Sequence, residues 1–404
     1  MRLTNFLIIV VFTGWPHFVV NAKPTELVIY HDADYSINVS SAKSMKMGML
    51  TALSEVEHSI NGVKVRLVSK DHRGNIRRSK ANMQQFLQEP NGLFVLGGLH
   101  SPPYIKNRTF INTSQIPLLV PWAAGGPVTR YADGENWVFR LSVDDTKAGI
   151  RISEFALQNK QCKSPHLLLE DTPWGKSNHK TMSSYLDNKV PFDVTWFGWN
   201  TKQNTAKTLI RNAMSSGADC ILLVANYTES KQFLNAMLAF PKEQRLPFIS
   251  HWGLTGGNTE RLMTPEVKSG VELHFIQSCF SFAKPHKPFT LTTINQAREQ
   301  FPIEFTQPEL LASPAGFVHA FDLGRIAISA LHQINLNKDI AAIRAEFKAA
   351  LENLNQPVQG LIKQYNKPFT VWSETKDDAH EALGLDDFCM AQFGAQNQVE
   401  VKYH

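Results

Sequence analysis

The sequence predicts an α/β protein with two lobes, each a parallel sheet covered by helices on both faces. Short apolar runs containing β-branched residues alternate with stretches whose apolar residues recur at helical spacing. The alternation begins near residue 25 and restarts near residue 147, so the 404 residues divide into two units of similar size. Strand-like segments return near the C-terminus. This return indicates that the chain crosses between the lobes several times.

Strands and helices alternate through the first unit. Residues 25–30 (TELVIY) form an apolar run typical of a buried strand, and residues 42–60 carry apolar side chains at the spacing of a helix. The other strands are expected at 63–68, 93–96 and 117–120, with helices at 79–88 and 105–112. This order is typical of parallel strands joined by crossover helices.

The second unit repeats the same alternation. Its strands are expected at 166–170, 192–197, 220–224, 247–250 and 271–275, and its helices at 147–159, 176–188, 201–216 and 230–239. Later helices are expected at 289–300, 312–333 and 340–354, and later strands at 367–372 and 387–393. Ligands of such folds bind where the carboxyl ends of the strands face a cleft.

Residues 1–22 have the features of a secretory signal peptide. Arg2 supplies a positive charge, residues 6–13 are apolar, and Val20 and Ala22 suit a cleavage site before Lys23. The alternative is an uncleaved anchor, but the apolar stretch is shorter than the ~20 residues of a membrane span. Export to the periplasm and a soluble chain from Lys23 onwards are therefore expected.

Composition and motifs exclude several other classes. A net charge of +5 and a pI of about 8.9 are mild for this length and do not indicate a nucleic-acid partner. Four cysteines exclude a disulfide-dense scaffold, and the lack of a Cys-x-x-Cys motif argues against structural zinc. The sequence contains no Gly-x-Ser-x-Gly, His-Glu-x-x-His or phosphate-loop motif. No enzyme activity, metal or cofactor is expected.

A series of motifs occurs in a characteristic order. They are Lys70-Asp71, 95–101 (VLGGLHS), 116–126 (IPLLVPWAAGG), Phe139-Arg140, 171–175 (DTPWG) and 319–331 (HAFDLGRIAISAL). Over about residues 25–400 the chain resembles type I periplasmic solute-binding proteins of ABC transporters, the Leu/Ile/Val-binding (branched-chain amino-acid and amide) family. The resemblance implies two Rossmann-like lobes that close on a solute like a Venus flytrap around a multi-strand hinge. It places 23–142 with about 279–374 in lobe 1, and 143–278 with about 375–404 in lobe 2.

The resemblance implies a monomer that delivers its solute to the membrane permease of an ABC transporter. One alternative is a binding protein that reports to a membrane sensor kinase or cyclase, since the chemistry of ligand capture is identical. A secreted hydrolase is a further alternative, but it needs a nucleophile and base or a metal set. The missing motifs and the fold both favour binding over catalysis.

The resemblance also implies the ligand-binding residues. Ser101 matches a hydroxyl that meets ligand oxygens just before a helix, with free N–H groups that favour anions, and the alternative is that it only caps that helix. Trp174 matches an aromatic that covers the ligand, and other aromatics follow strands at the cleft edge, although core packing is an alternative for them. The expected ligand-binding set is Ser101, His100, Trp122, Ala123, Ala124, Trp174, Tyr227 and Trp252.

One departure from the family bears on the ligand. Members that bind α-amino acids usually carry an acid where Trp252 stands, so a simple leucine-like ligand is not favoured. Aromatic residues suit an apolar body or a quaternary ammonium group. Asp32 or Asp34 is a candidate for the missing negative charge, although capping of a turn is the favoured interpretation. The expected solute is an amino-acid-like, amide or ammonium compound.

The four cysteines are candidates for two disulfides. Cys162 and Cys220 fall near the starts of two lobe-2 strands that neighbour each other in a 2-1-3 order, and export permits a bond between them. Cys279 and Cys389 fall near expected crossings between the lobes and are candidates for a second bond. Since four cysteines allow three full pairings, the sequence leaves the connectivity open.

Overall fold

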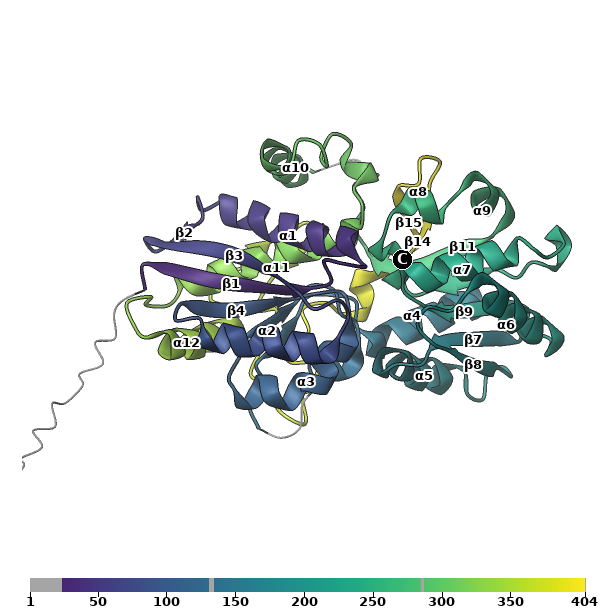
Figure 1. Cartoon of the computed structure of the whole chain (residues 1–404), viewed down its shortest axis with the longest axis horizontal. Helices are drawn as coiled ribbons and strands as arrows, with labels where there is room; N and C mark the ends of the chain where they lie inside the picture. Colours follow the sequence, from purple (N-terminus) through teal and green to yellow (C-terminus); the bar gives the residue numbers. More distant parts are fainter. Residues whose placement is uncertain (1–23, 131–133, 285–286, 404) are drawn as a thin grey trace, which may run out of the picture.

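The computed structural model describes residues 24–130, 134–284 and 287–403, and shows two lobes side by side along the long axis of the molecule (Figure 1). Each lobe is a mostly parallel sheet with helices on both faces, which confirms the predicted α/β class. The expected signal peptide lies outside the described residues. Within the described ranges, no helix is both long and apolar enough to cross a membrane.

Lobe 1 contains a six-stranded sheet in the order β2-β3-β1-β4-β5-β6. Its strands are β1 (Glu26–Ala33), β2 (Ser59–Ile60), β3 (Val63–Asp71), β4 (Gly92–Gly97), β5 (Leu118–Val120) and β6 (Val138–Arg140). All neighbouring pairs are parallel except β2 with β3. Its helices are α1 (Val39–Ser54), α2 (Ile76–Gln88), α3 (Ser101–Thr113), α10 (Pro288–Gln300), α11 (Pro314–His332) and α12 (Ile340–Glu352).

Alternation along β1 explains the two layers of helices in lobe 1. Leu27 and Ile29 point into the core formed with α1, α11 and α12, whereas Val28 and Tyr30 point into the core formed with α2 and α3. Successive side chains of a strand face opposite sides of its sheet, so one strand supplies both cores. The strand is apolar on both faces because helices cover both sides.

Lobe 2 contains a seven-stranded sheet in the order β15-β14-β11-β10-β9-β7-β8. Its strands are β7 (Pro165–Glu170), β8 (Asp193–Phe197), β9 (Cys220–Val224), β10 (Phe248–Ser250), β11 (Leu273–Ser278), β14 (Phe388–Phe393) and β15 (Val399–Tyr403), the last two antiparallel. One face is covered by α4 (Asp145–Gln158) and α5 (Pro173–Leu186). The other is covered by α6 (Gln203–Ser215), α7 (Tyr227–Met237), α8 (Thr259–Leu262) and α9 (Pro265–Gly270).

Several predicted boundaries were wrong. The first helix ends at Ser54 rather than at residue 60, because Glu57 and His58 adopt positive φ angles of 51° and 53° and turn the chain into β2. The strand expected at 367–372 is absent from the described residues, where Lys367 has a positive φ of 48° and the chain runs as a loop. The strands not expected are β2, β6, β15, β12 (Val358–Gln359) and β13 (Gln364–Tyr365).

In the described part of the chain, three segments cross between the lobes and form the hinge: one after β6, one after β11 and one before β14, and the first and third are hydrogen-bonded to each other. The Arg140 N–H donates to the carbonyl of His380 and the Ala382 N–H donates to the carbonyl of Arg140, both at 2.9 Å, so the first and third crossings lie side by side. The buried Arg140 guanidinium also donates to Glu381 at 2.6 Å and pairs with Asp144 at 2.8 Å. A hinge held together in this way can bend while the two lobes keep their alignment with each other.

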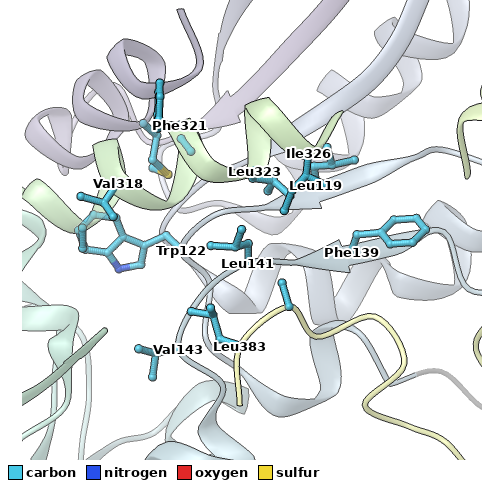
Figure 2. Close-up of a cluster of buried hydrophobic side chains, with 14 of the residues drawn as sticks. Leu119, Trp122, Phe139, Leu141, Val143, Val318, Phe321, Leu323, Ile326 and Leu383 are labelled. Atoms are coloured by element: carbon cyan, nitrogen blue, oxygen red, sulfur yellow. The ribbon is translucent and has the colours of Figure 1, made fainter. Parts of the chain in front are cut away.

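Apolar side chains of these crossings share a core with lobe 1. Leu141 and Val143 of the first crossing and Leu383 of the third gather beneath α11, beside Trp122 (Figure 2). All of these side chains are almost fully buried. The hinge is therefore part of the packed interior rather than a loose linker.

The cysteines form the two pairs named from the sequence. Cys162 is bonded to Cys220 with Cα atoms 6.1 Å apart, and Cys279 to Cys389 with Cα atoms 5.0 Å apart. Because Pro165 of β7 lies opposite Cys220 of β9, the first bond joins neighbouring strands at their amino ends. Among the described residues, the one cluster with metal-ligand spacing contains Cys162, Cys220 and Asp219, and the disulfide occupies both of its sulfur atoms.

Candidate ligand-binding site

A small cavity of about 10 Å³ lies between the closed lobes, and every residue that lines it is buried. Lobe 1 contributes residues that follow β4 and β5, and lobe 2 contributes residues that end or follow β7, β9 and β10. This position matches the rule that ligands of open parallel sheets meet the carboxyl ends of the strands. The lining residues are Leu99, His100, Ser101, Pro102, Trp122, Ala124, Glu170, Trp174, Asn226, Trp252 and Gly253.

Three tryptophans form much of the apolar wall. Trp122 of lobe 1 and Trp252 of lobe 2 pack against each other with ring centroids 5.3 Å apart. Trp252 also packs against His319 of α11, with ring centroids 4.9 Å apart. Trp174 begins α5 beside them and is 5% exposed. Contacts between these rings cross from one lobe to the other, so they form only when the lobes are closed.

A buried pair of polar residues sets the orientation of Trp174. The Trp174 indole N–H donates to Asp145 Oδ1 at 3.3 Å, and His251 Nε2 lies 2.9 Å from the same oxygen. The His251 ring also packs edge-on against the indole, with centroids 5.1 Å apart. Burial raises the pKa of Asp145, while the hydrogen bond from His251 lowers it. Asp145 is the first residue of α4, directly after the hinge, so it links the hinge to the Trp174 side chain in the cavity wall.

Glu170 is the one carboxylate in the lining. It is 1% exposed and ends β7. Its Oε2 accepts a hydrogen bond from Asn226 Nδ2 at 3.2 Å, whereas Oε1 has no well-aligned donor among the described residues. Burial raises the pKa of Glu170 to about 7, although nearby Trp199, Thr172 and His100 lower it. The sequence did not single out this residue. The signal that could have found it is a charged residue at the carboxyl end of an otherwise apolar strand, where ligands bind.

The start of α3 differs from the expectation for an anion site. His100 precedes the helix, and Ser101, Pro102 and Pro103 are its first residues. Proline has no backbone N–H, so two of the donors normally free at a helix start are missing. The Ser101 hydroxyl does not cap this helix; it accepts a hydrogen bond from the Gly125 N–H at 2.9 Å. Ser101 thus anchors the loop that carries Trp122 and Ala124.

Most of the expected ligand-binding residues meet in the cavity, but two do not. His100, Ser101, Trp122, Ala124, Trp174 and Trp252 line it. Ala123 lies outside the lining, and its carbonyl accepts a hydrogen bond from Arg140 Nη1 at 3.3 Å. Tyr227 also lies outside, packed so closely on Gly257 that a Cβ there would lie 2.3 Å from its ring. The sequence did not indicate Leu99, Pro102, Glu170, Asn226 and Gly253.

Neither candidate aspartate of the first loop lines the cavity. Asp32 is buried and accepts hydrogen bonds from Ser79 Oγ and Asn82 Nδ2, both at 2.6 Å. Asp34 caps the turn before α1 by accepting from the backbone N–H of Ile37 at 2.9 Å. It also lies 3.1 Å from His100 Nε2. The cavity therefore obtains its negative charge from Glu170 of lobe 2, not from the first loop.

A second pocket of about 70 Å³ shares His100 and Asn226 with the cavity and leads outward. Trp199, which follows β8, lines this pocket and the open surface groove beyond it. Its ring packs against His100 with centroids 5.7 Å apart, and it is 42% exposed. Both rings lie over Gly74, where a Cβ would lie 3.4 Å from each. Trp199 of lobe 2 and His100 of lobe 1 thus meet between the cavity and the surface.

Two α/β lobes with a buried cavity between them define a two-lobed ligand-binding protein. Residues 34–260, more than half of the chain, match the family model of the periplasmic binding proteins. The chain therefore belongs to the periplasmic binding protein family, as its motifs indicated. No curated protein sequence matches the chain.

Solved structures share the whole fold at low sequence identity. A type 1 periplasmic binding protein from Bordetella pertussis has a TM-score of 0.75 at 14% identity, covering 94% of this chain and 100% of that chain. The substrate-binding protein of a branched-chain amino acid transporter from Streptococcus pneumoniae, in complex with isoleucine, has a TM-score of 0.72 at 15% identity, covering 93% and 98%. A solute-binding protein from Rhodopseudomonas palustris, in complex with benzoate, has a TM-score of 0.73 at 13% identity, covering 94% and 96%.

Proposed function

We propose that this protein is a periplasmic solute-binding protein that captures a small solute between its lobes and delivers it to an ABC permease. The enclosed cavity is the observation that carries the proposal. Its lining comes from both lobes and is buried throughout, so a solute enters only when the lobes separate and is held when they close. The closed form then presents a surface that the open form lacks, which a membrane partner can recognise.

The expected solute is an amino-acid-like, amide or ammonium compound. Binding rather than catalysis suits Ser101 and His100, because both side chains already have structural partners. Ser101 Oγ accepts from Gly125, and His100 Nε2 lies between Asp34 and Asn38, both at 3.1 Å. Among the described residues, the hydrogen bonds of Ser101 and His100 do not pair the two as nucleophile and base.

Thermal melting of the mature chain from Lys23 tests the proposal. The panel contains amino acids, amides, amines, betaines and short organic acids. A ligand at about 100 times its Kd adds ~2.7 kcal/mol of stability, which raises the Tm by several degrees. Mass spectrometry of the denatured protein identifies any solute that was bound on purification. A flat panel from protein that carries no solute contradicts the proposed function.

A further inference from the structure

We infer that the solute is a small organic cation, an amine or methylated ammonium compound that carries no carboxylate. This inference rests on the proposed function and narrows its solute class. Three features of the cavity carry it: a buried carboxylate without a basic partner, a wall of tryptophan rings, and a helix start depleted of N–H donors.

Glu170 has no ion-pair partner among the described residues, and the basic side chain that acts on it, His100, is shared with Asp34. Among the described residues that line it, no lysine or arginine occurs, and the basic side chain of His100 faces Asp34 at 3.1 Å. In the adjoining pocket Arg73 pairs with Asp71 at 3.3 Å. Each base thus has its own acid, while Glu170 and Glu229 have no basic partner among the described residues. A buried carboxylate without a partner is costly, and a cationic solute offsets that cost.

The aromatic wall favours the same class of solute. Trp122, Trp174 and Trp252 come from three different strand ends and converge on one cavity. A cation over an indole face is attracted by the ring quadrupole, most strongly when both are desolvated. The Trp174 N–H already donates to Asp145, so this residue offers the solute its ring rather than a hydrogen-bond donor. A methylated ammonium needs no hydrogen bond and suits such a wall.

The lobe-1 side of the cavity argues against a carboxylate on the solute. Anions bind helix starts through free backbone N–H groups. Here Pro102 and Pro103 remove two of those groups at the start of α3, and Pro102 itself lines the cavity. Ser101 Oγ accepts from Gly125, which leaves its single hydroxyl proton for a ligand. A carboxylate would lack these backbone donors and would face Glu170 across the same small space.

Isothermal calorimetry with matched probes tests the inference at about pH 8, where Glu170 is ionised. Choline and ethanolamine are the cationic probes. The controls are the neutral carbon isostere of choline, its carboxylated counterpart glycine betaine, and the carboxylates leucine and benzoate. At least one cationic probe is expected to bind about tenfold or more tightly than the isostere and the carboxylates. Tighter binding of a carboxylate or of the neutral isostere overturns the inference and leaves the proposed function intact. No binding by any probe also overturns the inference, and the proposed function then depends on the melting panel.

The Glu170→Gln variant identifies the group responsible. Removing the charge is expected to reduce affinity for the cationic probe by about tenfold or more, with the Tm of the free protein unchanged or higher because an unpaired buried charge is removed. Glu299→Gln, an exposed change on α10, is the matched control and leaves the affinity unchanged. Equal affinity of the Glu170→Gln variant and its parent contradicts the inference.

Discussion

The indole of Trp122 in lobe 1 packs against the indole of Trp252 in lobe 2, with ring centroids 5.3 Å apart. Each residue follows a short interior strand of its own sheet, and both line the cavity. The contact breaks when the lobes separate. In the proposed function the same side chains serve solute capture and lobe closure, so a solute that fills the space between the lobes stabilises the closed population.

Trp174→Ala is expected to weaken solute binding by about 2 kcal/mol or more while the protein stays folded. The indole is 5% exposed and covers one side of the cavity, so its loss removes an aromatic contact and admits water. Calorimetry with the solute identified in the melting panel measures the change. Trp196→Ala is the control, because Trp196 lies on β8, is 37% exposed and packs against His179 instead. Similar losses in both variants would place Trp174 outside the site.

Trp199→Ala is expected to accelerate solute release by about tenfold with a smaller effect on association, since changes within one binding site act mainly on dissociation rates. Trp199 meets His100 between the cavity and the surface, so the truncated side chain leaves the closed lobes with a path outward. Stopped-flow fluorescence after dilution or displacement measures the rate. An unchanged dissociation rate would show that Trp199 does not hold the closed form.

Affinity for a cationic solute is expected to rise with pH between about 6 and 8. Burial raises the pKa of Glu170 to about 7, the nearby Glu229 carboxylate raises it further, and His100 lowers it. A cation favours the ionised form, so below this pKa the carboxyl group must release its proton on binding. Affinity then falls by up to about tenfold per pH unit. Calorimetry across this pH range measures the slope, and the Glu170→Gln variant should abolish it. A rising slope retained in that variant would assign the titration to another group, such as Glu229.

Much of the fold follows from local patterns, whereas the chemistry of the cavity depends on contacts between the lobes. Apolar periodicity predicts β1, β7 and β9, and tryptophans after β5 and β10 indicate a site at the strand ends. The sequence offers Asp32 and Asp34 as candidates for the acid in the cavity, because it does not show which strand end of the opposite lobe faces Trp122. Glu170 fills that place only because the closed lobes bring β7 across from α3. Likewise, Pro102 removes a free N–H group from a helix start only because α3 begins at Ser101, and the sequence alone does not fix that residue.

The Cys162–Cys220 bond is expected to stabilise the protein without affecting solute binding. It closes a segment of 58 residues, and loop-closure entropy gives about 4 kcal/mol for that length. Cys162 lies just before the amino end of β7 and Cys220 begins β9, whereas Glu170 and Asn226 lie at or beyond the carboxyl ends of these strands. A Cys162→Ser/Cys220→Ser double variant should lose stability in urea but keep its affinity. Non-reducing peptide mapping of the parent checks the pairing, and free thiols there would refute both disulfides.

Asp144→Asn is expected to destabilise the protein by about 3–5 kcal/mol, because it leaves a buried arginine with half of its counter-charge. Asp144 is fully buried and pairs with Arg140 at 2.8 Å, Arg130 at 2.9 Å and Lys147 at 3.2 Å. Asp377→Asn is the matched control: Asp377 also pairs with Arg130, at 3.2 Å, but its side chain is 63% exposed, so its loss should cost no more than about 1 kcal/mol.

The same network predicts the response of the hinge to acid. Burial alone raises the pKa of Asp144, but Arg140, Arg130 and Lys147 more than offset it and hold the pKa well below its usual range. A folded-state pKa below the unfolded value of about 3.9 means that the stabilisation is fully present above about pH 5 and is lost as the pH falls. Urea unfolding of the parent and both variants between about pH 7 and pH 3 separates this contribution from those of other acids. The Asp144→Asn variant should lose less stability across that range than the parent and the Asp377→Asn variant. Parallel pH profiles for all three proteins would show that Asp144 does not anchor the hinge through its charge.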